Sequence, residues 1–233
     1  MLWGIRPVEQ QAAYGLAVQR LRNQIHLGLL QPLERLPSER SLAETMAVSR
    51  VTLREALRIL ETEGYVTIKR GATGGAIVRD EEHLRALALR RIARDPAATM
   101  RVVEFLGVNE RVAARFAAAR RTPAHLKRMR EATAEIGHAS SFGALRRAES
   151  LFRMALAEAS LNPLLVRALE EAGASAFLPL PQGGLQQAVS ASHAERSALL
   201  RSVEARSEPD AEAAVASILD GEWARFRKLP KAS

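Results

Sequence analysis

The chain has 233 residues, of which 47% are hydrophobic and 26% charged, proportions that exclude a mainly disordered polypeptide and suit two compact domains. It has no cysteine, no signal-peptide pattern at its N-terminus and no apolar run near the ~20 residues of a membrane helix, so we expect a cytoplasmic protein without disulfides or a membrane partner. The formal net charge of +8 favours an anionic partner, nucleic acid first, although the excess is spread along the chain and marks no single face.

The first 80 residues predict three helices followed by a β-hairpin. Apolar residues recur every three or four positions in each helix, and Ser38 and Ser49 are placed to cap the second and third. A half-buried strand then alternates apolar and polar residues, and a glycine-rich turn leads into its partner. We expect the helices over residues 10–29, 39–46 and 50–63, and the strands over 65–69 and 76–78. This order of elements predicts a winged helix-turn-helix.

The remaining residues are rich in alanine, leucine and arginine and predict helices only. Capping residues before Pro123 and Pro163 indicate two of the helix starts. We expect helices near 82–94, 99–120, 123–137, 142–160, 163–175, 184–206 and 210–227. The expected fold is therefore mainly α. It has a winged helix-turn-helix domain over 1–79 and an all-α bundle or barrel over 80–233. We expect six or seven helices in the second domain, because the first of them could belong to a linker.

Basic side chains gather where a helix-turn-helix meets DNA. The second helix of such a motif enters the major groove by its N-terminal end, where arginine can bond to guanine and threonine to thymine or phosphate. The glycines of the wing let its turn approach a phosphate or the minor groove. The expected DNA contacts are Arg40, Ser49, Arg50, Thr52, Arg54 and Arg58 on the helices, and Lys69, Arg70, Gly71, Thr73, Gly74 and Gly75 in the wing. The alternative is that these arginines are ordinary solvated surface residues.

The segment LPSERSLAETMAVSRVTLREALRILETEG (residues 36–64) and the wing RGATGGAIV (residues 70–78) resemble the DNA-binding domain of GntR-family bacterial transcription regulators. The resemblance implies a homodimer whose two winged helices bind a short palindromic DNA operator. By motif position, Arg40, Arg50, Thr52 and Arg54 match family residues that contact DNA, and the wing glycines match its minor-groove tip.

The helical second half resembles the FCD effector domain of the FadR-type branch, best over residues 148–165, which implies that it senses a small metabolite. Many such domains hold a divalent metal with one aspartate and three histidines. Here Glu149 stands in place of the aspartate, Arg153 and Arg196 replace two histidines, and the third falls near Gly221. Guanidinium groups cannot coordinate a metal, so we expect no metal site and no other cofactor. The possible substitute ligands are His193, and Asp220 if the register slips by one residue.

The residues that replace the metal ligands are the candidate effector site. Glu149 and Arg153 are four residues apart and share a helix face, where they could form an ion pair. The family fold implies that Arg196 reaches the same cavity. Arginines there would favour a small carboxylate or phosphate effector, and the alternative is an ion-pair network that fills a vestigial metal site. The larger aromatic side chains are expected in the core: Phe105, Phe116, Phe142, Phe152 and Trp223.

These observations predict a ligand-responsive DNA-binding transcription regulator, with repression favoured over activation, and not an enzyme. No glycine-rich phosphate loop, metal-binding histidine spacing or serine-nucleophile motif is found, so no catalytic residue is expected. Two alternatives stay open. One is a constitutive DNA-binding protein whose helical domain only dimerises, and the other is a metal-dependent hydrolase with an appended DNA-binding domain.

Overall fold

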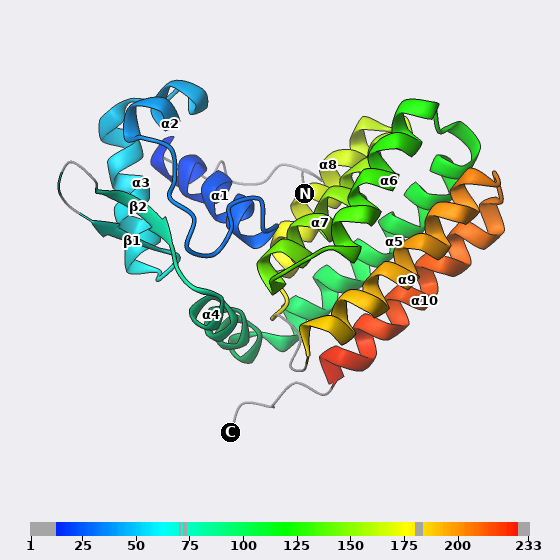
Figure 1. Cartoon of the computed structure of the whole chain (residues 1–233). Helices are drawn as coiled ribbons and strands as arrows, with labels where there is room; N and C mark the ends of the chain where they lie inside the picture. Colours follow the sequence, from blue (N-terminus) through cyan, green and yellow to red (C-terminus); the bar gives the residue numbers. More distant parts are fainter. Residues whose placement is uncertain (1–12, 70, 72–73, 180–183, 228–233) are drawn as a thin grey trace, which may run out of the picture.

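The computed structural model describes residues 13–69, 71, 74–179 and 184–227, which form ten helices and one two-stranded sheet (Figure 1). We refer to the elements from α1 to β2 as the winged-helix domain and to those from α4 to α10 as the helical domain. Within the described residues, no helix combines the length and hydropathy that crossing a membrane requires.

The winged-helix domain has the predicted order of elements. It contains α1 (Ala13–His26), α2 (Glu39–Met46), α3 (Arg50–Thr62), β1 (Val66–Lys69) and β2 (Gly75–Val78). The two strands pair antiparallel, with Val66 opposite Val78 and Lys69 opposite Gly75. Gly75 has φ of +128°, a conformation that L side chains rarely adopt, so the returning strand begins at a position that requires glycine.

The predicted helices of the winged-helix domain exist because one face of each is apolar. Val18, Leu21 and Ile25 of α1 pack against Leu53 and Leu60 of α3, and all five are at most 4% exposed. Helix α1 ends at His26, earlier than expected, because Gly28 turns the chain with φ of +73°. The described residues therefore confirm the winged helix-turn-helix.

The helical domain contains seven helices, the larger of the two expected numbers. They are α4 (Glu81–Arg94), α5 (Pro96–Arg120), α6 (Pro123–Gly137), α7 (Phe142–Ala159), α8 (Pro163–Ala176), α9 (Leu185–Glu204) and α10 (Glu208–Arg227). Helix α5 begins three residues earlier than predicted because the side chain of Asp95 accepts a hydrogen bond from the Ala98 amide and Pro96 fits the first turn.

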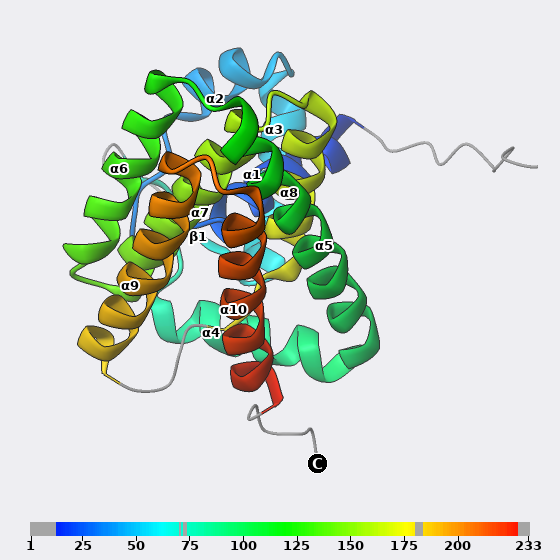
Figure 2. The same ribbon diagram turned by 90° about the vertical axis from the view of Figure 1, so that its right-hand side faces the viewer.

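The helices of the helical domain surround a core built largely of alanine and leucine. Helix α5 packs against α7, α8 and α10, α10 against α9, α9 against α6, and α6 against α7, as Figure 2 shows. Phe152 is buried in this core, and Phe116, Phe142 and Trp223 are partly buried against it or its neighbour. The prediction that Phe105 lies in the core is wrong, because its side chain is 52% exposed on the outer face of α5.

Candidate nucleic-acid interface and effector site

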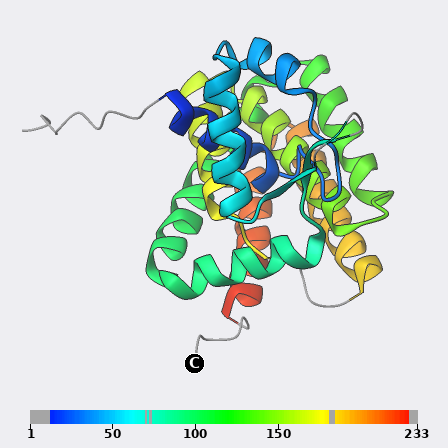
Figure 3. The same cartoon turned by 90° about the vertical axis from the view of Figure 1, so that its left-hand side faces the viewer.

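The N-terminal end of α3 is exposed and firmly capped. The Ser49 hydroxyl accepts a hydrogen bond from the Thr52 amide at 3.0 Å and lies 2.8 Å from the Thr52 hydroxyl. This cap fixes the first turn, while Leu53 and Leu57 anchor the opposite face in the core. Figure 3 shows α3 in front of the rest of the molecule, where a DNA duplex could approach it.

The four helical arginines predicted to contact DNA are all exposed: Arg40, Arg50, Arg54 and Arg58. Each of three is held by one exposed carboxylate: Arg40 by Glu44 at 3.0 Å, Arg54 by Glu39 at 2.7 Å and Arg58 by Glu55 at 2.9 Å. Arg50 is exposed, and no ion pair of its side chain is found within the part of the chain that the structure describes. Exposed pairs of this kind contribute little to stability, so their guanidinium groups can exchange a carboxylate for a phosphate or a base edge.

The wing lies beyond the first strand. Lys69 is exposed at the end of β1, and the Gly74 amide donates a hydrogen bond to the Gly71 carbonyl at 2.8 Å across the turn. Gly71 is exposed with φ of +105°, which places an unhindered backbone at the tip. Two of the predicted wing contacts, Arg70 and Thr73, fall outside the described residues.

The three predicted effector residues lie together inside the helical domain, within a network of buried charges. Arg153 of α7 pairs with Glu110 of α5 at 3.4 Å, and the two side chains are 12% and 3% exposed. Arg196 of α9, also 3% exposed, lies 3.0 Å from Glu195 and 3.8 Å from Glu222 of α10. We call these five residues, together with Glu149, the buried ion network.

Glu149 does not form the expected ion pair with Arg153, since Arg153 turns to Glu110. The Glu149 carboxylate instead accepts a hydrogen bond of 2.6 Å from the Ser192 hydroxyl on α9. The negative charge of Glu149 still raises the pKa of Arg153 at longer range. The network therefore joins α5, α7, α9 and α10 through side chains that are far apart in the sequence.

The electrostatics of the network follow from burial. Burial alone would lower the pKa of Arg153, but the carboxylates of Glu110, Glu222 and Glu149 together raise it. Loss of hydration raises the pKa of Glu222, and the two arginines only partly offset that effect. Arg153 thus stays charged, and carboxylates outnumber the guanidinium groups in the buried ion network.

The donor set does not fit the metal that the domain type implies. Guanidinium groups occupy the ion-paired centre, and they repel a divalent cation instead of binding it. His193 is exposed and lies against Gly137 of α6, away from the network. Across the described part of the chain, no group of three or more histidine, aspartate or glutamate side chains is arranged to hold a metal ion.

Sequence reasoning missed three members of the network, Glu110, Glu195 and Glu222. The positions of Glu110 and Glu222 carried a signal, because each of these two glutamates continues an apolar stripe that faces the interior. Glu110 follows Val103 and Leu106, and Glu222 follows Val215 and Ile218. An acid at a core position of a helix needs a partner, and that need points to the two arginines whose positions the sequence did single out.

A second cluster connects the two domains around His26, the last residue of α1. Because a carbonyl can only accept, the His26 Nδ1 donates to the Ala174 carbonyl of α8 at 2.7 Å, and Nε2 accepts from the Tyr65 hydroxyl at 2.9 Å. Phe177, which follows α8, stacks on the histidine ring at 3.8 Å. We call these four residues, His26, Tyr65, Ala174 and Phe177, the joint; they combine an aromatic stack with two buried hydrogen bonds.

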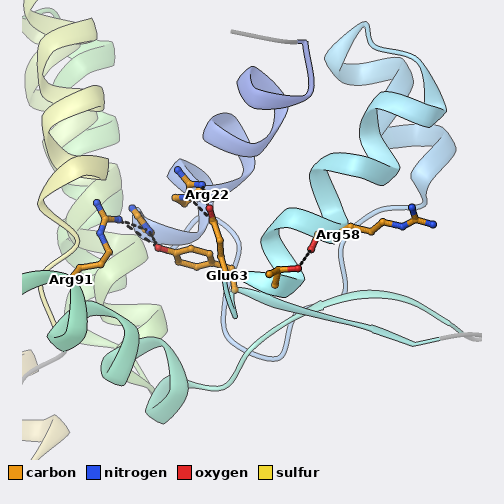
Figure 4. A network of polar contacts seen from close by, with 7 residues as sticks. Arg22, Arg58, Glu63 and Arg91 are labelled. Carbon is orange, nitrogen blue, oxygen red and sulfur yellow. Dashed lines mark hydrogen bonds and ion pairs between the residues drawn. The ribbon is translucent and has the colours of Figure 1, made fainter. Parts of the chain in front are cut away.

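Arginines surround this joint. Arg91 of α4 lies 3.3 Å from His26 Nε2, and Arg146 of α7 donates to the His26 carbonyl at 3.3 Å. Figure 4 shows Arg91 reaching toward the winged-helix domain, near the Arg22–Glu63 pair that ties α1 to the end of α3 at 2.7 Å. Loss of hydration lowers the pKa of Arg146 to about 10.

The surroundings of His26 keep its ring neutral. Burial and the nearby charges of Arg91, Arg146 and Arg22 hold its pKa well below the usual value. A small apolar cavity of about 20 Å³ lies beside the joint, between Ile25, Leu84 and Phe177, with room for roughly one water molecule. It is too small for a metabolite.

Two family models match the chain. The model described as "Bacterial regulatory proteins, gntR family" matches residues 13–74, and the model described as "FCD domain" matches residues 101–221. The first match covers the winged-helix domain almost to its end, and the second covers most of the helical domain.

Among curated proteins, the chain is similar to the HTH-type transcriptional regulator LutR of Bacillus subtilis, with 33% identity over 147 residues, 59% of this chain and 64% of that protein. It is also similar to the Uxu operon transcriptional regulator of Escherichia coli K12, with 35% identity over 140 residues, 58% of this chain and 53% of that protein. The matches thus span less than two thirds of either relative. Both relatives are transcriptional regulators and not enzymes.

Two solved structures share the fold over nearly the whole chain. They are E. coli McbR/YncC, with 20% identity and a TM-score of 0.51, and a putative transcriptional regulator GntR from Rhodococcus sp. RHA1, with 18% identity and a TM-score of 0.52. Each comparison covers 94% of this chain, and 99% and 100% of the respective structures. At this identity the likeness concerns the fold alone.

Proposed function

Because this chain belongs to the GntR family of bacterial regulatory proteins and carries an FCD domain, we propose that it represses transcription as a homodimer bound to a palindromic DNA operator. A small molecule that binds the helical domain would change the affinity for that operator. The domain boundary near residue 80 is part of the proposal, with the winged-helix domain as the DNA reader and the helical domain as the sensor.

The observation that carries the proposal is the exposed, capped end of α3. It presents Arg50, Thr52 and Arg54 together, on a helix whose other face is buried. A recognition helix needs this combination, because rigid backing fixes the side chains that read bases while solvent exposure leaves them free to do so.

The proposal is tested by the affinity of the full chain for DNA from the region upstream of its own gene. Arg50→Ala is expected to weaken specific binding by roughly 1–3 kcal/mol per half-site. Arg167→Ala, which removes an exposed arginine from α8, is the matched control for net charge and is expected to leave the affinity nearly unchanged. Equal losses in both variants, or none in either, would contradict the assignment of α3.

The predicted anionic effector meets a specific obstacle in the buried ion network. Each arginine already faces at least one carboxylate, and the carboxylates outnumber the guanidinium groups. A carboxylate or phosphate ligand would therefore have to displace Glu110 from Arg153 or Glu222 from Arg196. This observation favours the alternative in which the network is structural and fills a vestigial metal site.

A thermal-shift series separates these two readings. Succinate, citrate and inorganic phosphate are suitable probes, measured with the full chain and with Arg196→Lys, which keeps the charge but loses the planar fork that bonds bidentately. If one probe raises the melting temperature of the parent chain and not of the variant, the anionic effector is supported. No shift with any of them supports the structural ion-pair network.

If an effector binds at Arg153, helix α8 is placed to couple that binding to the winged-helix domain. A methyl group added at Gly173 of α8 would lie 3.7 Å from Arg153 Nη1 and 3.4 Å from Leu27 Cδ2, which follows α1. The next residue, Ala174, accepts the hydrogen bond from His26. The last turn of α8 thus contacts the buried ion network and the DNA-binding domain at once, which supports α8 as the coupling element.

A further inference from the structure

Phe177 belongs to the helical domain by sequence but to the core of the winged-helix domain in space. It follows α8, yet its side chain is 5% exposed and packs in the cluster of buried residues that α1 and α3 form. Its ring stacks on that of His26 with 10° between the ring planes, and lies 6.1 Å from the ring of Tyr65. Within the described residues, neither buried cluster of the helical domain includes it. The helical domain thus supplies a core side chain to the DNA-binding domain.

The backbone at Phe177 is held in a conformation that phenylalanine does not prefer. Its φ is +27°, in the left-handed region, which a residue with a Cβ atom keeps only where its surroundings fix it. On one side, the Ala174 carbonyl accepts the hydrogen bond from His26. On the other side, the Leu178 carbonyl accepts a hydrogen bond from Arg146. Contacts between the two domains therefore fix the chain where α8 ends.

Arg146 of α7 connects the two domains at the same place. Its guanidinium group donates to the Leu178 carbonyl and to the carbonyl of His26, and it lies 5.6 Å from the centre of the Phe177 ring. The turn after α1 also lies directly on α7, since a methyl group added at Gly28 would be 3.0 Å from the Arg147 amide nitrogen. Two elements of the helical domain, α7 and the segment after α8, thus hold the end of α1.

Helix α1 transmits this position to the recognition helix. It lies between α3 and α8, as Figure 1 shows. Its apolar face packs on α3, and Arg22 pairs at 2.7 Å with Glu63, which follows α3. Because these contacts fix α1 on α3, whatever holds α1 also sets the direction in which α3 projects.

We propose that Phe177 is a positioning residue that fixes the winged-helix domain on the helical domain and so sets the spacing between the two operator half-sites. The inference rests on the proposed function, since it needs a homodimer that binds a palindrome. Two recognition helices must meet major grooves about one helical turn apart, and each inserted base pair shifts a half-site by about 3.4 Å and rotates it by roughly 35°. A rigid joint cannot follow this change, whereas a loosened joint can.

Operator spacing tests the inference in the full chain. The palindrome that the parent chain binds most tightly is selected from a random DNA library. Its affinity is compared, by fluorescence anisotropy, with that of the same palindrome carrying two extra central base pairs. The insertion is expected to weaken binding of the parent chain about fiftyfold or more, and binding of Phe177→Ala about fivefold or less. Phe177→Leu keeps an apolar side chain but loses the ring stack, so it gives an intermediate result and serves if the alanine variant does not fold.

Leu169→Ala is the matched control for lost core packing. Leu169 also lies on α8 and is 0% exposed, but it packs in a cluster of the helical domain that does not include the joint. Its loss is expected to lower the melting temperature as Phe177→Ala does, and to leave the spacing preference of the parent chain unchanged. If Phe177 were merely structural, the two alanine variants would have the same spacing preference.

Scanning calorimetry tests the joint without DNA. The parent chain is expected to unfold in one transition and Phe177→Ala in two, because domains that no longer share a core side chain melt separately. A parent chain that melts in two transitions would overturn the inference. A Phe177→Ala variant that keeps the spacing preference of the parent chain would refute the inference alone, whereas a parent chain that binds no palindrome would refute the proposed function with it.

Discussion

The arginines of this chain occupy two opposite environments. On the winged-helix domain, Arg40, Arg54 and Arg58 are 76%, 57% and 70% exposed, and each pairs with a single exposed carboxylate. In the helical domain, Arg153 and Arg196 are 12% and 3% exposed and face several buried carboxylates. Exposed pairs exchange partners at little cost, whereas buried pairs cannot lose a member without leaving a charge in the interior. We therefore propose that the same residue type serves recognition in one domain and cohesion in the other.

The largest effect is expected where the buried ion network loses a cation. Arg153→Met leaves Glu110, which is 3% exposed, without its partner, and is expected to lower the free energy of unfolding by about 3–5 kcal/mol. Chemical denaturation at pH 7 measures the loss. Adding Glu110→Gln to Arg153→Met removes the uncompensated charge and should restore part of the stability.

This double variant separates the two roles open to Arg153, a ligand contact and a structural ion pair. If stability returns but the response to an effector does not, Arg153 contacts the ligand. A loss below about 1 kcal/mol in the single variant, the range of exposed ion pairs, would show that the buried and exposed arginines do not differ in the way argued above.

The second effect concerns recognition instead of stability. Arg54→Ala is expected to weaken operator binding by roughly 1–3 kcal/mol per half-site and to change the free energy of unfolding by less than about 0.5 kcal/mol. Fluorescence anisotropy with labelled DNA, beside a denaturation curve of the same sample, measures both quantities. A variant that loses stability and keeps its affinity would reverse the proposed division between the domains.

The local features of the fold were predictable because short-range chemistry sets them. Ser38 and Ser49 cap helices that the apolar periodicity also indicates, and the exposed side of α3 follows from the same pattern. The partners of the buried arginines were not predictable from spacing. Arg153 has Glu149 within one turn, yet it pairs with Glu110, 43 residues away, because helix packing decides which carboxylate lies closest.

The same limit applies to the contact between the domains and to the exposed aromatic residue. Phe177 comes from the end of α8 but completes the core of the winged-helix domain, which no local pattern indicates. Phe105 lies among the helical residues of α5, but its side chain is exposed, so periodicity alone did not distinguish a core aromatic from an exposed aromatic. Both outcomes depend on which helix faces lie side by side in three dimensions.

The third effect concerns pH and tests the joint around His26. The folded pKa of His26 lies well below its unfolded value of about 6.5, so the folded chain binds fewer protons there than the unfolded chain. The contribution of His26 is therefore fully present above that value. It is lost as the pH falls below it, by up to about 1.4 kcal/mol per pH unit.

Denaturation curves between pH 5 and pH 7.5 measure this slope, and His26→Gln should flatten it. His138→Gln, a change outside the joint, is the control and should keep the slope of the parent chain. The opposite contribution of Glu222, whose pKa is raised, falls as the pH rises above its unfolded value of about 4.5, so it is common to all three proteins and cancels in the comparison.

The smallest effect is expected from the carboxylate that holds Arg54. Glu39 lies 2.7 Å from Arg54 at the start of α2, where its negative charge would face the phosphates of bound DNA. Glu39→Gln removes that repulsion and frees the guanidinium group, so operator affinity should rise about twofold to fivefold. The free energy of unfolding should fall by only about 0.5 kcal/mol, because the pair is exposed. If the affinity falls instead, Glu39 orients Arg54 for base contact, and the exposed pair does not exchange its carboxylate as freely as argued above.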